Sequence, residues 1–188
     1  MRRVVLYMMT SVDGFIAGPD GDLDWMISPD EERQAEALEQ LDAIDTALIG
    51  RGVYEEMVRY WPTASGEYAD RVNAMPKLVF SRRSSEQLSW NNARIVPVAG
   101  DADLADQVIR LKTQPGKDMV LFGGARLAQS FVRLALVDEY RLCVQPVALG
   151  SGRPLFGDLK SRTPLTLIAT HPFPSGAALT TYRPAQSN

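Results

Sequence analysis

The chain has 188 residues, of which 45% are hydrophobic, and a formal net charge of -3 at pH 7. This size and composition predict a single domain, residues 1–188, with a sizeable core. The small net charge excludes a general attraction to nucleic acid or to an anionic membrane, so an anionic ligand would need a local basic pocket. The single cysteine, Cys143, and the single histidine, His171, exclude an intrachain disulfide and a metal site rich in either residue.

The N-terminal residues predict a buried strand and no export signal. Val4 to Met9 form a short apolar run directly after Arg2 and Arg3. That run is short for the central region of a signal peptide, and no small-residue cleavage site follows it. No segment approaches the ~18 apolar residues of a membrane span, so we expect a cytoplasmic protein without membrane contact.

The first half of the chain alternates apolar runs with segments of helical periodicity. After a loop rich in Gly and Asp (10–28), Ser28-Pro29-Asp30-Glu31 predicts the start of a helix, with Ser28 as its cap and Glu31 closing a capping box. The other elements expected in this half are a strand at 46–49, a helix through 54–58, an irregular connection at 61–75, and strands at 77–81 and 93–98.

The second half continues the alternation and then changes to consecutive strands. A helix led by Asp101 and Asp103 precedes a buried strand at 119–122, and Gly123-Gly124 opens another helix. The remaining expected strands are 139–149, 164–170 and 177–182. Strands with helical crossovers, followed by consecutive strands, predict an α/β fold with a mostly parallel sheet and an antiparallel edge.

Two strand-to-helix junctions contain glycines suited to binding phosphate. They are Leu48-Ile49-Gly50-Arg51-Gly52 and Leu121-Phe122-Gly123-Gly124-Ala125. Glycine lets the backbone approach a phosphate closely, and a helix N-terminus offers unpaired N–H groups. The alternative is that each turn needs glycine only for its own conformation. Neither junction matches the Gly-x-Gly-x-x-Gly fingerprint, which argues against a Rossmann domain.

Basic side chains follow the expected strands at the same sheet edge. Ser81, Arg82 and Arg83 come directly after the strand at 77–81, and Arg51 follows the strand before it. Ligands of open parallel sheets bind beyond the carboxyl ends of the strands. A hydroxyl and two guanidinium groups suit a dianionic phosphate. For Arg83 a solvated surface charge is the favoured interpretation.

Taken together and in this order, several segments resemble the dihydrofolate reductase superfamily, especially its branch that contains the reductase domain of riboflavin biosynthesis. The segments that carry the resemblance are 11–17, 23–25, 48–54, 76–82, 122–125, 138–140 and 146–152. The resemblance spans nearly the whole chain. It implies a three-layer α-β-α fold with a mostly parallel central sheet and antiparallel C-terminal strands.

The resemblance also implies NADPH, that is NADP(H), as the cofactor of a small-molecule reductase. The residues that would bind its 2′-phosphate are Arg51, Ser81 and Arg82. The residues that would line its pyrophosphate are Gly50, Gly123, Gly124 and Ala125. Ile16 and Ala17 would approach the nicotinamide, and Trp25, in the loop above it, would line the substrate pocket.

A proton donor is needed beside the hydride acceptor, and Asp30 is the candidate catalytic acid. The resemblance places an acid five residues after the loop tryptophan, which is Asp30 counted from Trp25. The alternative is that Asp30 simply favours the first turn of its helix. Asp13 is the second candidate acid, and a turn before Gly14 is its better interpretation.

The predicted substrate is a small polar molecule other than folate. The helix after Asp30 offers Glu31, Arg33 and Gln34, and Met75-Pro76 stands where an arginine for the folate tail is expected. A pterin-like or ribosylaminopyrimidine compound fits better. The zinc motif of the deaminase often fused to riboflavin-type reductases is absent.

Two functions of different classes therefore stand open. The first is an NADPH-dependent reductase of a pterin-like or ribosylaminopyrimidine substrate. The second is an NADP-binding module, such as a sensor or assembly subunit, without turnover. By analogy with the riboflavin branch the chain is expected to form a homodimer, through late strands in which Leu142, Val144 and Val147 are exposed to pairing.

Overall fold

The structure is a computed structural model that describes residues 1–83, 87–157, 159 and 161–185. Its main feature is a sheet of eight strands, within these residues. Their order across the sheet is β5 (Ala93–Pro97), β4 (Lys77–Ser81), β3 (Ile44–Gly50), β6 (Asp118–Gly123), β1 (Val4–Thr10), β7 (Glu139–Val144), β10 (Ala178–Pro184) and β9 (Leu165–Pro172).

The strand directions confirm the predicted sheet. β1 pairs in parallel with β6 and with β7, and β3 pairs in parallel with β4 and with β6. β10 is antiparallel to both β7 and β9. A short antiparallel pair, β2 (Phe15–Ala17) with β8 (Arg153–Pro154), lies outside the main sheet and was not predicted.

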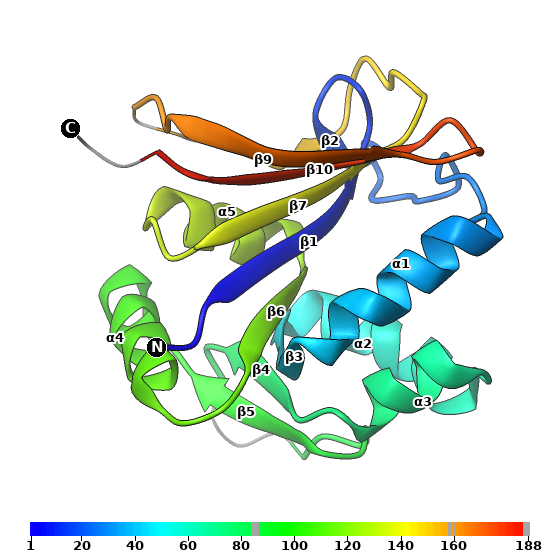
Figure 1. The fold of residues 1–188 in the computed structure, drawn as a ribbon. Helices are drawn as coiled ribbons and strands as arrows, with labels where there is room; N and C mark the ends of the chain where they lie inside the picture. Colours follow the sequence, from blue (N-terminus) through cyan, green and yellow to red (C-terminus); the bar gives the residue numbers. More distant parts are fainter. Residues whose placement is uncertain (84–86, 158, 160, 186–188) are drawn as a thin grey trace.

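Helices cover both faces of the sheet, as Figure 1 shows. On one face lie α1 (Glu31–Asp42), α2 (Arg51–Tyr60), the short 3₁₀ helix η1 (Trp61–Thr63) and α3 (Glu67–Ala74). On the other face lie α4 (Asp101–Thr113) and α5 (Ala125–Arg133). The molecule therefore has the expected three-layer α-β-α arrangement. None of the helices within the described residues is long and apolar enough to cross a membrane.

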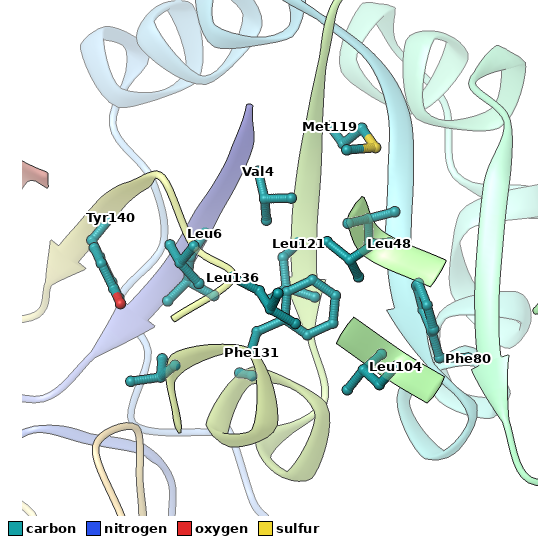
Figure 2. Packing of buried hydrophobic residues seen from close by; sticks show 14 of the residues in the cluster. Val4, Leu6, Leu48, Phe80, Leu104, Met119, Leu121, Phe131, Leu136 and Tyr140 are labelled. Carbon is teal, nitrogen blue, oxygen red and sulfur yellow. The ribbon is translucent and has the colours of Figure 1, made fainter. Parts of the chain in front are cut away.

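The two central strands separate the two cores because successive side chains of a strand point to opposite faces. Leu6 and Leu121 are in register and pack with α4 and α5, as Figure 2 shows. The next residues along each strand, Tyr7 and Phe122, pack on the side of α1, α2 and α3. The ring of Phe131 meets that of Phe80 edge-on at 5.8 Å and joins α5 to β4.

The start of α1 differs from the sequence prediction. Its N-cap is Asp30 and not Ser28, because the Asp30 carboxylate accepts a hydrogen bond from the backbone N–H of Arg33 at 2.9 Å. Asp30 has extended backbone geometry, with φ of -73° and ψ of 172°. The helix consequently begins at Glu31, and the predicted capping box is not formed.

The connection predicted to be irregular at 61–75 contains η1 and α3. α3 has eight residues, and its buried side chains are only Ala69 and Val72. Two buried positions are too few to make a clear helical period, and Pro62 and Gly66 supply turn signals. The helix forms because its apolar residues pack on the core beneath α1 and α2.

The end of β7 also corrects the sequence analysis. The strand stops at Val144 instead of continuing to 149, because Pro146 has no N–H for the ladder and Val147 turns back to bond to the carbonyl of Gln145. β7 lies between β1 and β10, and Leu142 is buried. Leu142 and Val144 are therefore not on an exposed pairing edge, whereas β9 is the outer strand on this side of the sheet.

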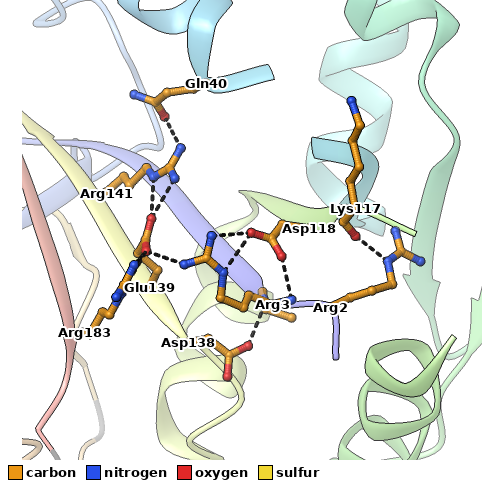
Figure 3. Close-up of polar contacts among 10 residues, drawn as sticks. Arg2, Arg3, Gln40, Lys117, Asp118, Asp138, Glu139, Arg141 and Arg183 are labelled. Atoms are coloured by element: carbon orange, nitrogen blue, oxygen red, sulfur yellow. Dashed lines mark hydrogen bonds and ion pairs between the residues drawn. The ribbon is translucent and has the colours of Figure 1, made fainter. Parts of the chain in front are cut away.

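A buried carboxylate joins the strands at the end of the sheet where the parallel strands begin. The side chain of Glu139 is 3% exposed. It accepts hydrogen bonds from Arg183 at 2.9 and 3.0 Å, from Arg141 at 2.8 Å and from Arg3 at 3.0 Å, as Figure 3 shows. Arg3 also bonds to Asp118 at the start of β6. One carboxylate thus links β1, β7 and β10.

The three arginines decide the charge state of Glu139. Burial is the largest influence and raises the pKa of this carboxyl, but the hydrogen bonds from Arg183 and Arg141 and the charge of Arg3 together lower the pKa below its ordinary value of 4.5. The ionised form is therefore stabilised by folding. That stabilisation is present above about pH 4.5 and is lost as the pH falls through the lowered pKa.

Replacing Glu139→Gln should destabilise the fold strongly. Three guanidinium groups would lose their shared anion, and removing one partner from a buried ion pair costs about 3 kcal/mol or more. Urea unfolding at pH 7 measures the loss, and Glu56→Gln, at an exposed position of α2, is the control. The difference from the unaltered protein should shrink below pH 4. An unchanged urea midpoint at pH 7 would contradict this account of the cluster.

Candidate functional site

The parallel strands bring their carboxyl ends to one edge of the sheet. Gly50 ends β3, Ser81 ends β4 and Gly123 ends β6. Register pairs Gly50 with Phe80, and Ile49 with Gly123. The predicted glycine and arginine–serine residues therefore meet at one edge, although they come from distant parts of the sequence.

The two glycine turns touch each other. A Cβ atom added to Gly124 would lie 3.6 Å from the Cα atom of Gly50, and one added to Gly50 would lie 3.5 Å from the carbonyl oxygen of Gly123. Gly123 and Gly124 have φ of 100° and 90°, a region that other residues rarely adopt. The backbone conformation therefore favours glycine at 123 and 124, and it places the two turns in van der Waals contact.

Each glycine turn is followed by a helix, and both helices begin at the same edge of the sheet. Gly50 is the N-cap of α2 and Gly124 is the N-cap of α5, and neither helix start has a side-chain cap. Backbone N–H groups and the positive ends of two helix dipoles consequently converge at the edge. Such an arrangement can bind two neighbouring phosphates.

The arginine–serine group lies beside these turns. Arg51 is the first residue of α2, forms an ion pair with Glu55 at 3.1 Å, and has its guanidinium carbon 5.3 Å from the centre of the Tyr54 ring. Ser81 is buried, and its hydroxyl accepts a hydrogen bond from the N–H of Arg83 at 3.0 Å. Arg82 is exposed. Glu55 is 56% exposed, and an ion pair with so exposed a partner is weak.

The loop after β1 is fastened by Asp13. Its carboxylate accepts hydrogen bonds from the hydroxyl of Ser11 at 2.6 Å, and from the N–H groups of Leu149 at 3.1 Å and Gly150 at 2.7 Å. The bond from Ser11, followed by the backbone bonds, lowers the pKa of Asp13 to about 2. Asp13 is thus an ionised clamp between two loops, in agreement with its interpretation as a turn residue.

This clamp supports β2, which carries the residues expected near the nicotinamide. Ile16 and Ala17 are buried in β2. β8 approaches them so closely that a Cβ atom on Gly152 would lie 2.3 Å from the carbonyl oxygen of Ala17. Trp25 is half-buried in the following loop, and its indole N–H donates to the carbonyl of Asp22 at 3.2 Å.

The carboxylate of Asp30 joins α1 to the turn between β9 and β10. Besides the N–H of Arg33, it accepts a hydrogen bond from the N–H of Ser175 at 3.0 Å. The interactions with Ser175 and then with Arg33 lower the pKa of Asp30 to about 2. Asp30 therefore carries no proton at neutral pH in this conformation, and it acts here as a hydrogen-bond acceptor.

Two buried residues near Asp30, Arg33 and Gln145, are joined by a hydrogen bond. Arg33 is 5% exposed, and it donates to the side-chain oxygen of Gln145 at 3.2 Å and to the carbonyl of Ile27 at 2.9 Å. Gln145 is fully buried just beyond the end of β7. Within the described residues Arg33 forms no ion pair. It was expected to face a substrate, but the fold uses it to join α1 to the loop and to β7.

A narrow recess lies on the same face, between the sheet, α1 and α3. Its lining residues are Tyr7, Ala37, Gln40, Leu41, Ile44, Tyr68, Val120 and Phe122. Phe122 is the residue directly before the Gly123-Gly124 turn. The recess was not predicted because α3, which supplies Tyr68, was not predicted. The apolar runs of the buried strands do not by themselves indicate a recess.

The sheet order and the pair of glycine turns define a dihydrofolate-reductase-like α/β domain. The chain belongs to the RibD C-terminal domain family, whose pattern it matches over residues 2–179. It is similar to the uncharacterised Bacillus subtilis protein YyaP, with 37% identity over 96% of this chain and 94% of YyaP. Membership of this reductase-like family supports a role as a reductase in general.

Solved structures agree on the fold. A putative riboflavin biosynthesis protein from Shewanella sp. PV-4 superposes with a TM-score of 0.75 at 24% identity, covering 98% of this chain and 99% of that one. Dihydrofolate reductase from Enterococcus faecalis, solved with NADP(H), superposes with a TM-score of 0.67 at 13% identity, covering 98% and 97% of the two chains. At these identities the likeness concerns the fold alone.

The contact between the glycine turns gives a stability prediction. Gly124→Ala should lower the free energy of unfolding by about 1–3 kcal/mol, because it forces a side chain into a backbone region reserved for glycine. Gly52→Ala is the matched control, since a Cβ atom there meets nothing within 4 Å. The control should be neutral or up to about 1 kcal/mol more stable, because alanine favours the helix. Equal denaturation midpoints for the two variants would contradict the prediction.

Proposed function

We propose that this protein is an NADPH-dependent reductase that transfers a hydride to a pterin-like or ribosylaminopyrimidine substrate, with residues 1–188 acting as one domain. The observation that carries the proposal is the contact between two glycine turns, each opening a helix, at the carboxyl edge of the sheet. When bound, NADPH supplies the hydride. The chain binds and orients the cofactor beside the substrate.

The residues at this edge fit a phosphorylated dinucleotide. The pyrophosphate has two charged groups, and two helix starts converge where it would lie, at Gly50, Gly123, Gly124 and Ala125. Arg51, Ser81 and Arg82 would hold the 2′-phosphate, since they follow the adjacent strands β3 and β4. Ile16 and Ala17 would meet the nicotinamide at the other end of the site. The proposal thus gives each region of the cofactor its own set of residues.

Cofactor preference tests the phosphate assignment. Arg51→Ala should weaken NADPH binding by about tenfold or more, because a charge-assisted hydrogen bond contributes roughly 1.5–3 kcal/mol, and it should leave NADH binding unchanged. Fluorescence titration measures both constants. Arg59→Ala, at an exposed position later in α2, is the control and should change neither. Equal losses for the two cofactors in Arg51→Ala would reject the assignment.

A second candidate function is an NADP-binding module without turnover, such as a sensor. It is favoured by one observation, the engagement of the Asp30 carboxylate by two N–H groups, which keeps it ionised. The reductase proposal instead requires that substrate binding change this environment, so that a proton reaches the reduced ring from or through Asp30. Oxidation of NADPH in the presence of pterins, dihydrofolate and ribosylaminopyrimidines separates the two functions. Tight cofactor binding with no turnover of any compound would favour the module.

Asp30→Asn separates a catalytic from a structural role. Asparagine is as good an N-cap as aspartate, so the helix and the denaturation midpoint should be retained. Under the reductase proposal kcat should fall by about 100-fold or more, the usual contribution of general acid–base catalysis, with NADPH affinity unchanged. Asp20→Asn, in the exposed loop before Trp25, is the control. A variant of Asp30 with full activity would make this residue a cap only.

We also propose a homodimer formed through β9. β9 is one of the two edge strands of the sheet, and Leu167 and Ile168 on it are 54% and 48% exposed. An unpaired edge with apolar side chains invites pairing with another chain. The late strands therefore remain the proposed contact, although the residues differ from Leu142 and Val144.

The dimer proposal predicts a mass change on mutation. Sedimentation equilibrium should give twice the chain mass for the unaltered protein, and the chain mass for a double variant Leu167→Lys and Ile168→Lys, because buried lysines would oppose the contact. Ile109→Lys, at an exposed apolar position of α4, is the control and should remain dimeric. A monomeric unaltered protein would overturn the proposal.

A further inference from the structure

Arg51, the first residue of α2, lies over an aromatic ring of its own helix. Its guanidinium carbon is 5.3 Å from the centre of the Tyr54 ring. Residues three positions apart lie on the same face of a helix, so the contact follows from the spacing of the two residues. Attraction between a guanidinium group and the face of a ring limits where the long arginine side chain can lie. The contact therefore restricts Arg51 before any ligand binds.

The ring of Tyr54 is itself held in place by the core. Tyr54 is 3% exposed and belongs to the apolar cluster on the side of α1, α2 and α3. Its hydroxyl oxygen accepts a hydrogen bond from the backbone N–H of Trp90 at 3.0 Å. Trp90 is 36 positions further along the chain, in the segment before β5. The ring that contacts Arg51 is consequently fixed both by packing and by a long-range hydrogen bond.

Trp90 is anchored in turn to α3 and to β4. Its indole N–H donates to the side-chain oxygen of Asn73 at 2.8 Å, and the Nζ atom of Lys77 lies 4.5 Å from the centre of its ring. Lys77 is buried and also donates to the carbonyl oxygen of Asn73 at 2.5 Å. One connected set of contacts thus runs from Arg51 through Tyr54 and Trp90 to the start of β4.

A guanidinium group held over a ring can still bind a phosphate. The ring attracts the positive charge as a whole, whereas the hydrogen bonds to phosphate come from N–H groups in the guanidinium plane. Arg51 follows β3, and Ser81 and Arg82 follow the neighbouring strand β4. A phosphate bound at this edge would meet an arginine whose freedom is already reduced, and this lowers the entropy cost of binding.

From these contacts we propose that Tyr54 is a positioning residue of the cofactor site, whose ring holds Arg51 ready for the 2′-phosphate of NADPH. The inference rests on the proposed reductase function. It adds to the preference for NADPH over NADH a residue that lies outside the glycine turns and the arginine–serine group. Tyr54 acts through Arg51, and Trp90 keeps the ring in place.

A pair of substitutions isolates the effect of the ring. Tyr54→Phe and Tyr54→Leu both remove the hydroxyl and leave the N–H of Trp90 unpaired, but only Tyr54→Leu removes the ring. Fluorescence titration should show NADPH binding about three- to tenfold weaker in Tyr54→Leu than in Tyr54→Phe, the effect of one partly buried cation–π contact, with equal NADH binding. Tyr60→Leu is the control, because Tyr60 is a 63% exposed residue of the same helix, and it should change neither constant.

A double-mutant cycle separates positioning from a general structural effect. In a protein that already carries Arg51→Ala, adding Tyr54→Leu should leave the ratio of NADPH to NADH affinity unchanged, because no guanidinium group remains to be positioned. A structural defect at Tyr54 would instead act in both backgrounds. An equal loss of NADPH affinity with and without Arg51 would overturn the proposal.

An NMR measurement on the unaltered protein does not depend on how the Tyr54 variants fold. Without cofactor, the side-chain protons of Arg51 should resonate upfield of those of Arg59, an exposed arginine of α2, because they lie over an aromatic ring. The Arg51 signals are assigned by their loss in Arg51→Ala. Equal shifts for the two arginines would mean that the ring does not hold Arg51 in solution, and they would overturn the proposal.

Failure of the proposed function has a different signature from failure of this inference. If Arg51→Ala lowers NADPH affinity selectively but Tyr54→Leu and Tyr54→Phe bind NADPH equally, the cofactor assignment stands and the positioning role of Tyr54 is rejected. If the unaltered protein does not bind NADPH, or if Arg51→Ala weakens NADPH and NADH binding equally, the proposed cofactor site is rejected and the inference with it.

Discussion

Strand β1 lies in the middle of the sheet and is hydrogen-bonded in parallel to β6 on one side and to β7 on the other. Because β1 is paired on both sides, its side chains point only to the two faces of the sheet. One side of β1 faces the core of α4 and α5, and the other contributes Tyr7 to the recess under α1. Its carboxyl end leads into the loop clamped by Asp13. The loop before β2 and the recess under α1 are therefore both positioned by one central strand.

Much of the fold could be predicted because buried parallel strands have distinctive apolar runs. The strands at 46–49, 77–81 and 119–122, and the glycines that follow two of them, were all located from pattern. Short elements were not, since α3 has only two buried side chains and β8 only two residues. Their positions depend on tertiary packing, which leaves little periodic signal in the sequence.

The candidate site likewise has a part that could be predicted from the sequence and a part that could not. Glycines and arginines after strands are visible in the sequence, and the fold brings Gly50 and Gly124 together. The hydrogen bond from Ser175 to Asp30 spans 145 positions and could not be foreseen, yet it changes the interpretation of that acid. The recess was hidden for a similar reason, because Tyr7 and Tyr68 come from a strand and from an unrecognised helix. Local sequence patterns indicate candidate site residues, but long-range contacts determine their hydrogen bonds and protonation.

The two glycine turns also limit how this protein could evolve or be redesigned. At Gly124 the constraint is its φ of 90°, which side chains rarely adopt, and at Gly50 it is the side chain of Leu127, which an added Cβ atom would meet at 3.3 Å. The exposed Arg82 and the partly exposed Arg51 have no such restriction. Under the proposed function, cofactor preference could therefore change through single substitutions of the arginines, whereas the turns allow little variation.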